Sequence, residues 1–234
     1  MTDAPADSSD LDALVARIDP DRWLSSRFIA DPEARADVVA IYAYDHELAR
    51  APRVASNSLL GEIRLTWWHE ALDEVFEGRP VRHHPVAQVL AGVVARRSLP
   101  RAPLEAMIDA RYRELDATPM SRAEALDWAR DTGGQAAVLA ALILDPACEA
   151  QAALPAGTAW ALSHKIGGGG AEPETAAALP DLMLKARAGA RLLSVAAFPA
   201  AAHAALARTR AAGRRPTALA ARMALLRAVM FARI

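Results

Sequence analysis

The stretch IYAYDHELARAPRVASNSLLGEIRLTWWHEALDE, residues 41–74, decides the fold class. Its second half carries two adjoining apolar stripes at helical spacing. The first stripe consists of Ile63, Trp67, Ala71 and Val75, and the second of Leu65, Trp68, Leu72 and Phe76. Two neighbouring stripes give one helix a wide apolar face. We therefore predict a helix at 58–77 that packs centrally rather than at the periphery.

The rest of the chain has a helical pattern as well, because alanine and arginine favour helices and no β-type alternation occurs. Proline, glycine and N-cap positions predict helices at 10–18, 20–30, 33–50, 58–77, 85–97, 101–116, 122–145, 151–166, 175–197, 199–212 and 216–232. Ser58 and Ser121 are the expected N-caps of two of them. We expect one all-α domain at 13–234, a flexible tail at 1–12 and a flexible glycine-rich loop at 167–174.

Charge is distributed unevenly along the chain, although the formal net charge is −1. After Asp181 the sequence has no acidic residue, while Lys185 and nine arginines give this segment ten positive charges. Such a segment fits an anionic partner, namely a membrane surface, an acidic protein or a nucleic acid. It fits equally a set of solvated helix faces that balance the acidic first part of the same fold.

The last predicted helix, in PTALAARMALLRAVMFARI, carries an apolar stripe with arginines beside it. The stripe consists of Leu219, Met223, Leu226 and Met230, and the arginines are Arg222, Arg227 and Arg233. This pattern is typical of a basic helix lying on an anionic membrane, and also of a final core helix. We expect no nucleic-acid partner, because the basic segment has only Phe198 and Phe231 as aromatic residues and no DNA-binding motif.

The number of cysteines and the length of the apolar runs indicate the cellular compartment of the protein. The single cysteine, Cys148, excludes an internal disulfide framework and a cysteine-based zinc cluster. No run approaches the roughly 20 apolar residues that cross a bilayer, and the start MTDAPADSSDLDAL lacks the regions of a signal peptide. We expect a cytoplasmic protein, with peripheral contact to the inner membrane through the basic C-terminal segment.

Common catalytic motifs are missing from the sequence. His69 and Asp73 are spaced for one helix face, but no HExxH motif or evident third ligand accompanies them. The glycines at 167–170 are followed by Ala171 and Glu172 instead of the lysine and hydroxyl of a phosphate loop. No GxSxG nucleophile motif occurs. We therefore expect no metal site of these kinds and no nucleophilic triad.

Two longer segments point to a family. DRWLSSRFIADPEARADVVAIYAYDHELA, residues 21–49, and LGEIRLTWWHEALDEVFEGRPVRHHPVAQVL, residues 60–90, resemble the squalene/phytoene synthase family. MIDARYRELD, ARDTGGQAAVLAALIL and AGTAWALSHKI resemble its following helices. The resemblance implies an isoprenoid-synthase-type helical bundle with a central cavity. In active members, two aspartate-rich segments there hold Mg²⁺ ions, which neutralise the diphosphate leaving group.

The sequence departs from this pattern at the aspartates. The positions that match the first acidic motif are Ala49, Arg50 and Arg53, and no acid lies between Glu149 and Glu172, where the second motif belongs. Asp45 and Glu47 lie on different faces of their helix. We therefore predict that both Mg²⁺ motifs are lost, that no cofactor binds and that the protein is non-catalytic. A branch of the family similar in its ELAR sequence and its lost aspartates acts in assembly of respiratory complex I, and the chain resembles this branch.

The resemblance supplies candidate site residues and partners. Tyr42, Asp45, Arg64, Trp67 and Trp68 are expected to line the cavity, with core packing as the alternative. Arg35 and Arg64 would face phosphate, or else form ion pairs between helices. Respiratory complex subunits or a prenyl lipid are the expected partners. The alternative function is an active prenyltransferase that recruits Asp45, Glu70 and Asp73 to hold Mg²⁺.

Overall fold

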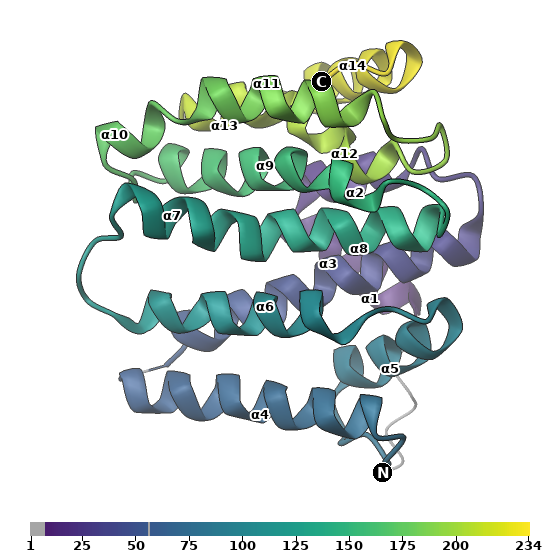
Figure 1. The fold of residues 1–234 in the computed structure, drawn as a ribbon, viewed down its shortest axis with the longest axis vertical. Helices are drawn as coiled ribbons and strands as arrows, with labels where there is room; N and C mark the ends of the chain where they lie inside the picture. The colour runs from purple at the N-terminus through teal and green to yellow at the C-terminus, as the bar shows by residue number, and fades with distance from the viewer. Residues whose placement is uncertain (1–7, 56) are drawn as a thin grey trace.

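The computed structural model describes residues 8–55 and 57–234, and every regular element within them is a helix. The all-α prediction is therefore confirmed. The longer helices are stacked in layers from α4 (Ser58–Phe76) at one end of the molecule to α14 (Ala218–Phe231) at the other (Figure 1). The prediction that the helix at 58–77 packs centrally is therefore wrong, and Ile63 of its first stripe is 55% exposed. Among the described residues, no helix is both long and apolar enough to cross a lipid bilayer.

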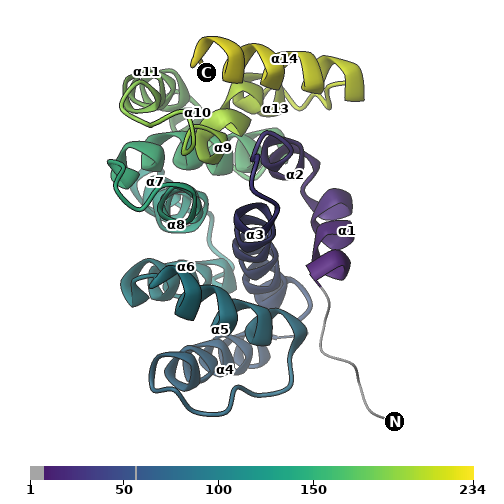
Figure 2. The same ribbon diagram turned by 90° about the vertical axis from the view of Figure 1, so that its right-hand side faces the viewer.

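The first three helices are α1 (Ser8–Ile18), α2 (Pro20–Ser26) and α3 (Pro32–Arg53). The carboxylates of Asp19 and Asp31 cap α2 and α3, and a proline follows each cap. These caps fix the two helix starts because they satisfy backbone N–H groups that have no partner inside the helix. The resulting α3 is long and lies centrally, against α1 on one side and α6 and α8 on the other (Figure 2).

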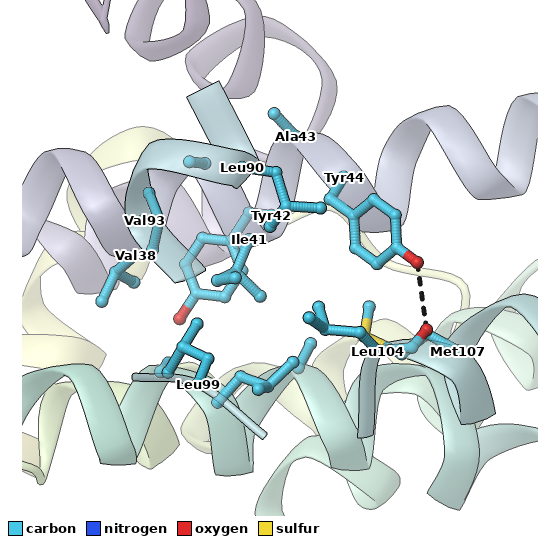
Figure 3. Packing of buried hydrophobic residues seen from close by; sticks show 14 of the residues in the cluster. Val38, Ile41, Tyr42, Ala43, Tyr44, Leu90, Val93, Leu99, Leu104 and Met107 are labelled. Atoms are coloured by element: carbon cyan, nitrogen blue, oxygen red, sulfur yellow. Dashed lines mark hydrogen bonds between the residues drawn. The ribbon is translucent and has the colours of Figure 1, made fainter. Parts of the chain in front are cut away.

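The main hydrophobic core surrounds α3. It is closed by α4 (Ser58–Phe76), α5 (Pro85–Arg97) and α6 (Arg101–Tyr112), the last followed by a 3₁₀ turn (Arg113–Leu115). Tyr42 and Tyr44 are fully buried in this core, and the Tyr44 hydroxyl donates a hydrogen bond of 3.0 Å to the Leu104 carbonyl (Figure 3). The tyrosine-rich segment is thus an internal packing element of the bundle.

A second centre forms around α9 (Leu154–Gly167), which the 3₁₀ turn Ala150–Ala153 precedes. One continuous helical run packs against it, made of α7 (Arg122–Ala129), the π-helical turn η2 (Arg130–Gly134) and α8 (Gln135–Leu144). Gly133 and Gly157 meet where the two helices cross. A Cβ atom at Gly157 would lie 2.1 Å from the Gly133 carbonyl oxygen, so glycine is required for this close approach.

The C-terminal part covers α9 with short helices. These are α10 (Pro173–Ala176), α11 (Leu179–Ala190), α12 (Pro199–Ala202), η4 (His203–Leu206), α13 (Ala207–Ala211) and α14 (Ala218–Phe231). Apolar residues of α11, α12, η4 and α14 form a second core cluster. The basic segment is therefore folded into the bundle, with α14 at its outer end (Figure 1).

Several predicted boundaries need correction. Helix α1 begins at Ser8, so residues 8–12 of the predicted tail are helical, and residues 1–7 lie outside the described part. The connection between α9 and α10 spans only 168–172, shorter than the predicted loop at 167–174, because Pro173 starts a helix. Asn57 rather than Ser58 caps α4, and its side chain accepts from the Leu60 N–H. The predicted helix at 175–197 is divided at Ala177 and ends at Ala190.

Candidate functional site: an arginine-lined cleft

A cleft of about 590 Å³ opens between α2, α3, η2, α9 and the segment that joins α13 to α14. Seven arginines line it, against two carboxylates, Asp19 and Asp45. The arginines are Arg17, Arg22, Arg53, Arg111, Arg210, Arg214 and Arg215. With histidines counted as neutral, the lining carries an excess of five positive charges. Such a concentration of like charge in a hollow attracts anions.

Asp45 forms the base of the cleft between two buried arginines. Its carboxylate accepts hydrogen bonds from Arg22 Nη2 at 2.8 Å and from Arg111 Nη2 at 2.5 Å. Burial alone would raise the pKa of Asp45, but the charges of Arg22 and Arg111 outweigh it and lower that pKa. Asp45 is therefore a carboxylate whose charge is already compensated by protein groups.

Both arginines keep hydrogen-bond donors that have no partner among the described residues. The free atoms are Arg22 Nη1 and Arg111 Nε, and both side chains are only 4–5% exposed. The Arg22 guanidinium lies between two aromatic rings, 4.7 Å from the centre of Tyr42 and 4.2 Å from that of Trp160. Buried donors without a partner are rare in folded proteins. These donors are therefore available to an acceptor at this end of the cleft.

The rim of the cleft holds the remaining arginines. Arg210 is held by Asp21 through Nε at 2.7 Å and through Nη2. The other four, Arg17, Arg53, Arg214 and Arg215, have no ion-pair partner within residues 8–55 and 57–234. Guanidinium groups form charge-assisted hydrogen bonds with phosphate oxygens, often two at a time. The rim therefore suits a phosphate-bearing ligand.

The donor set of the cleft does not fit Mg²⁺. A magnesium ion takes oxygen ligands from carboxylates, but Asp19 is bonded to Arg22, and Asp45 to Arg22 and Arg111. At the positions that match the first acidic motif, Ala49 and Arg53 line the cleft. No cluster of three metal-ligating His, Cys, Asp or Glu side chains occurs in the described part of the chain.

The alternative ligand set of Asp45, Glu70 and Asp73 does not come together either. Glu70 accepts from Arg82 at 3.0 Å, and Asp73 accepts from Arg101 at 2.5 Å. His69, the helix-face neighbour of Asp73, lies 3.0 Å from Asp109 instead. Each of these groups is engaged in its own pair on the α4 side of the molecule, so they do not form a common metal site with Asp45.

The predicted site residues are divided between two hollows. Asp45 lines the cleft and Tyr42 lies beneath Arg22, whereas Arg64, Trp67 and Trp68 line a second hollow of about 390 Å³. Helix α3 separates the two. Asp45, His46, Ala49 and Arg53 face the cleft, and Glu47, Arg50, Ala51 and Val54 face the second hollow. At about 100° per residue these two sets occupy opposite sides of the helix.

Arg35 is half-buried on α3 and lines neither hollow. Neither Arg35 nor Arg64 forms an ion pair within the described residues, so the predicted pairing between helices is not observed there. The sequence did not single out six arginines of the cleft or its Trp160; the arginines are Arg17, Arg22, Arg111, Arg210, Arg214 and Arg215. The excess of arginine after Asp181 was the one signal that pointed toward three of them.

Comparisons with known proteins agree with this fold. A family model described as squalene/phytoene synthase matches residues 15–166. The crystal structure of a dehydrosqualene synthase in complex with ligand is similar with a TM-score of 0.78 over 96% of this chain and 95% of that one, at 14% identity. This likeness confirms the isoprenoid-synthase-type fold. The predicted central cavity stays a prediction.

Three curated relatives are named NADH dehydrogenase (ubiquinone) complex I, assembly factor 6, or its homolog. The chain is 30% identical to the Bos taurus protein and 29% to the Homo sapiens protein over 103 residues, which is 44% of this chain and 30% of each relative. The Dictyostelium discoideum protein is 28% identical over 97 residues, 40% of this chain and 27% of its own length. The aligned part thus covers less than a third of these relatives.

The family match extends over more than half of the chain, which therefore belongs to the squalene/phytoene synthase family.

Proposed function

We propose that this protein binds a phosphate-bearing prenyl lipid in the arginine-lined cleft without Mg²⁺, does not transfer prenyl groups, and acts in the assembly of respiratory complex I. The observation that carries the binding part is the pairing of Asp45 with Arg22 and Arg111 at the base of a cleft with five excess positive charges. A carboxylate held in this way leaves the surrounding arginines free to neutralise a ligand's phosphates.

The same arrangement argues against catalysis. Prenyl transfer begins when the carbon–oxygen bond to diphosphate breaks, and the developing charge on the leaving group must be stabilised more strongly than in the ground state. In active members of the family Mg²⁺ ions supply this stabilisation, and the two carboxylates of the cleft are already paired with arginines. Without the metal ions we expect the cleft to bind the ligand but not to ionise it. The cleft thus binds the diphosphate group and does not assist its departure with a metal ion.

The role in assembly rests on the relatives named complex I assembly factor 6. The chain aligns with less than a third of their length, so this part of the proposal needs its own test. Deleting the gene in its host and measuring NADH:ubiquinone oxidoreductase activity and complex I abundance provides it. We expect both to fall together. Normal complex I in the deletion strain would remove the assembly role while leaving ligand binding intact.

Binding is tested with purified protein, farnesyl diphosphate and EDTA, followed by tryptophan fluorescence, because Trp128 and Trp160 line the cleft. We expect saturable quenching that EDTA does not change. An Arg53→Ala/Arg215→Ala variant should bind at least about tenfold more weakly, since each charged hydrogen bond contributes about 1.5–3 kcal/mol.

An Arg35→Ala/Arg64→Ala variant is the matched control, because it removes the same charge from residues outside the cleft. Its affinity should equal that of the wild type. Diphosphate release is followed in the same samples with Mg²⁺ added. Metal-dependent release of diphosphate would replace this proposal with the alternative of an active prenyltransferase, and equal affinity of all three proteins would exclude the cleft as the binding site.

A further inference from the structure

Helix α14 is apolar on two opposite sides. Its inner side, Ala221, Leu225 and Ala228, is buried against the C-terminal core cluster. Its outer side carries large apolar side chains that face solvent. These are Leu219 (70% exposed), Met223 (49%), Leu226 (38%) and Met230 (66%), and Phe231 (63%) follows at the end of the helix. The inner side of α14 therefore packs in the core. The outer stripe, which the sequence analysis identified, is exposed in the monomer.

Arginines flank this outer stripe on both sides. At about 100° per residue, the four stripe residues fall within an arc of about 60°, and Arg222 and Arg227 each lie about 70° from its centre, on opposite sides. Both are exposed, as is Arg233 beyond the helix end. Arginines placed in this way can keep their charged ends at the level of lipid head groups while the stripe enters the apolar layer beneath. We call this surface, residues 219, 222, 223, 226, 227, 230 and 231, the α14 face.

The neighbouring surface has the same character. Helix α11 lies at the same end of the molecule as α14 (Figures 1 and 2), and Arg187 Nε donates a hydrogen bond of 2.8 Å to the Ile234 carbonyl, which ties the two helices together. Leu184 and Leu192 are 60% and 66% exposed there, next to the exposed Lys185 and Arg191. No acidic residue follows Asp181 in the chain. The same end of the molecule thus carries further exposed apolar and basic residues besides those of α14.

We propose that the α14 face docks this protein on an anionic phospholipid membrane, with α14 lying in the plane of the head groups. A second copy of the chain fits the face less well, because a twofold contact would bring Arg222 and Arg227 against the same basic face of the partner. An anionic bilayer offers both an apolar layer for the stripe and negative charge for the flanking arginines. This inference goes beyond the proposed function and holds whether or not the cleft binds a prenyl lipid.

The experiment is flotation of the full-length protein with two kinds of vesicle, pure phosphatidylcholine and phosphatidylcholine mixed with phosphatidylglycerol. We expect the wild type to float only with the anionic vesicles and to be released as salt is raised. A Met223→Glu/Leu226→Glu variant, which changes only exposed side chains, should bind anionic vesicles at least about tenfold more weakly. Circular dichroism and thermal melting of this variant confirm that the fold is retained.

The matched control is Leu59→Glu/Ile63→Glu on α4, because these side chains are 61% and 55% exposed at the opposite end of the molecule (Figure 1). This control should float like the wild type. Failure of the wild type to bind anionic vesicles overturns the proposal, as does equal loss of binding in both variants. Sedimentation velocity distinguishes the main rival. A wild-type dimer that the α14 variant abolishes, without vesicle binding, would identify a protein interface instead.

Discussion

Asp45 compensates two guanidinium groups that are almost completely removed from water. Arg22 and Arg111 approach it from α2 and α6, and each side chain is at most 5% exposed. Arg22 has Asp19 as a second partner and Arg111 has Glu114, so Asp45 is the carboxylate that the two arginines share. An uncompensated charge in such a place is costly because burial removes its hydration. Asp45 therefore contributes to stability as well as to the charge balance of the cleft.

Replacing this residue gives a direct measure of that contribution. We expect Asp45→Asn to lower the free energy of unfolding by about 3 kcal/mol, the lower end of the usual range for a broken buried ion pair, because Asp19 and Glu114 still pair with the two arginines. Asp37→Asn is the control, because Asp37 is equally buried but its partners Arg96 and Arg97 are 46% and 21% exposed and can return to water. Its loss should be about 1–2 kcal/mol. Urea unfolding followed by circular dichroism measures both, and equal losses would contradict the argument.

His203 gives the protein a specific pH dependence. Burial, and next the charge of Arg22, lower its pKa from 6.5 to about 3, and neither ring nitrogen has a partner among the described residues. As pH falls below 6.5 the unfolded chain takes up a proton at this position and the folded protein does not. The folded state therefore loses stability between pH 6.5 and pH 3.

A His203→Phe variant should lack this dependence. Between pH 7.5 and pH 5, we expect the wild type to lose about 2 kcal/mol more of its free energy of unfolding than the variant does. Chemical unfolding at both pH values measures the difference. The comparison does not depend on the packing effect of the new ring, since that effect is the same at each pH. Equal pH slopes in the two proteins would show that His203 is not the responsible group.

Glycine sets the distance between two of the packed helices. Gly157 of α9 lies against the Gly133 carbonyl of η2, and a Cβ atom there would come within 2.7 Å of the Ala137 Cβ as well. Both obstacles belong to backbone or to a short side chain, so neither can move without shifting a helix. The Gly133–Gly157 crossing thus fixes the distance between two walls of the cleft.

We expect Gly157→Ala to destabilise the protein by about 2 kcal/mol or more, because overpacking forces the backbone apart. Gly92→Ala on α5 is the opposite case. A Cβ atom there meets only the flexible Arg96 Nη1, at 3.2 Å, and alanine favours the helix by about 0.5–1 kcal/mol. Thermal melting of the two variants should therefore shift in opposite directions. A stabilised Gly157→Ala would disprove the close crossing.

The positions of the helices were largely predictable from local sequence signals. Which face of each helix is buried was not. Ser121 caps α7 as predicted, in a capping box with Glu124, and the helix at 85–97 has the predicted bounds. The stripe on α14 has two physical meanings, and only the packing of Leu225 against the C-terminal core shows which side is buried. Likewise, the partners of Asp45 are 23 and 66 residues away, on helices whose relative placement no local pattern encodes.

At the scale of the whole molecule, the bundle has two packing centres, α3 and α9, joined through α8 and α2. Tryptophans report on both, with Trp67 and Trp68 near the first and Trp128 and Trp160 near the second. The predicted single domain at 13–234 requires that the two centres unfold together. Urea transitions followed by tryptophan fluorescence and by far-ultraviolet circular dichroism should coincide. Two separated transitions would divide the chain into two domains.

The sequence pointed to only some of the residues that line the cleft. Ala49 and Arg53, two of the positions that match the first acidic motif, line the cleft. The resemblance also led to Arg64, Trp67 and Trp68, which α3 separates from that cleft. The missed residues come from α1, α2, α6, α9, α13 and the segment after α13, and only the tertiary fold brings them to one place.

The π-helical turn at Arg130–Gly134 bears on how this chain is aligned with its relatives. A π turn accommodates one additional residue while the helix on either side keeps its direction. A relative whose corresponding helix is α-helical throughout should therefore be one residue shorter between positions 122 and 144. Alignments without a gap at this place would pair the wrong residues along one half of the helix.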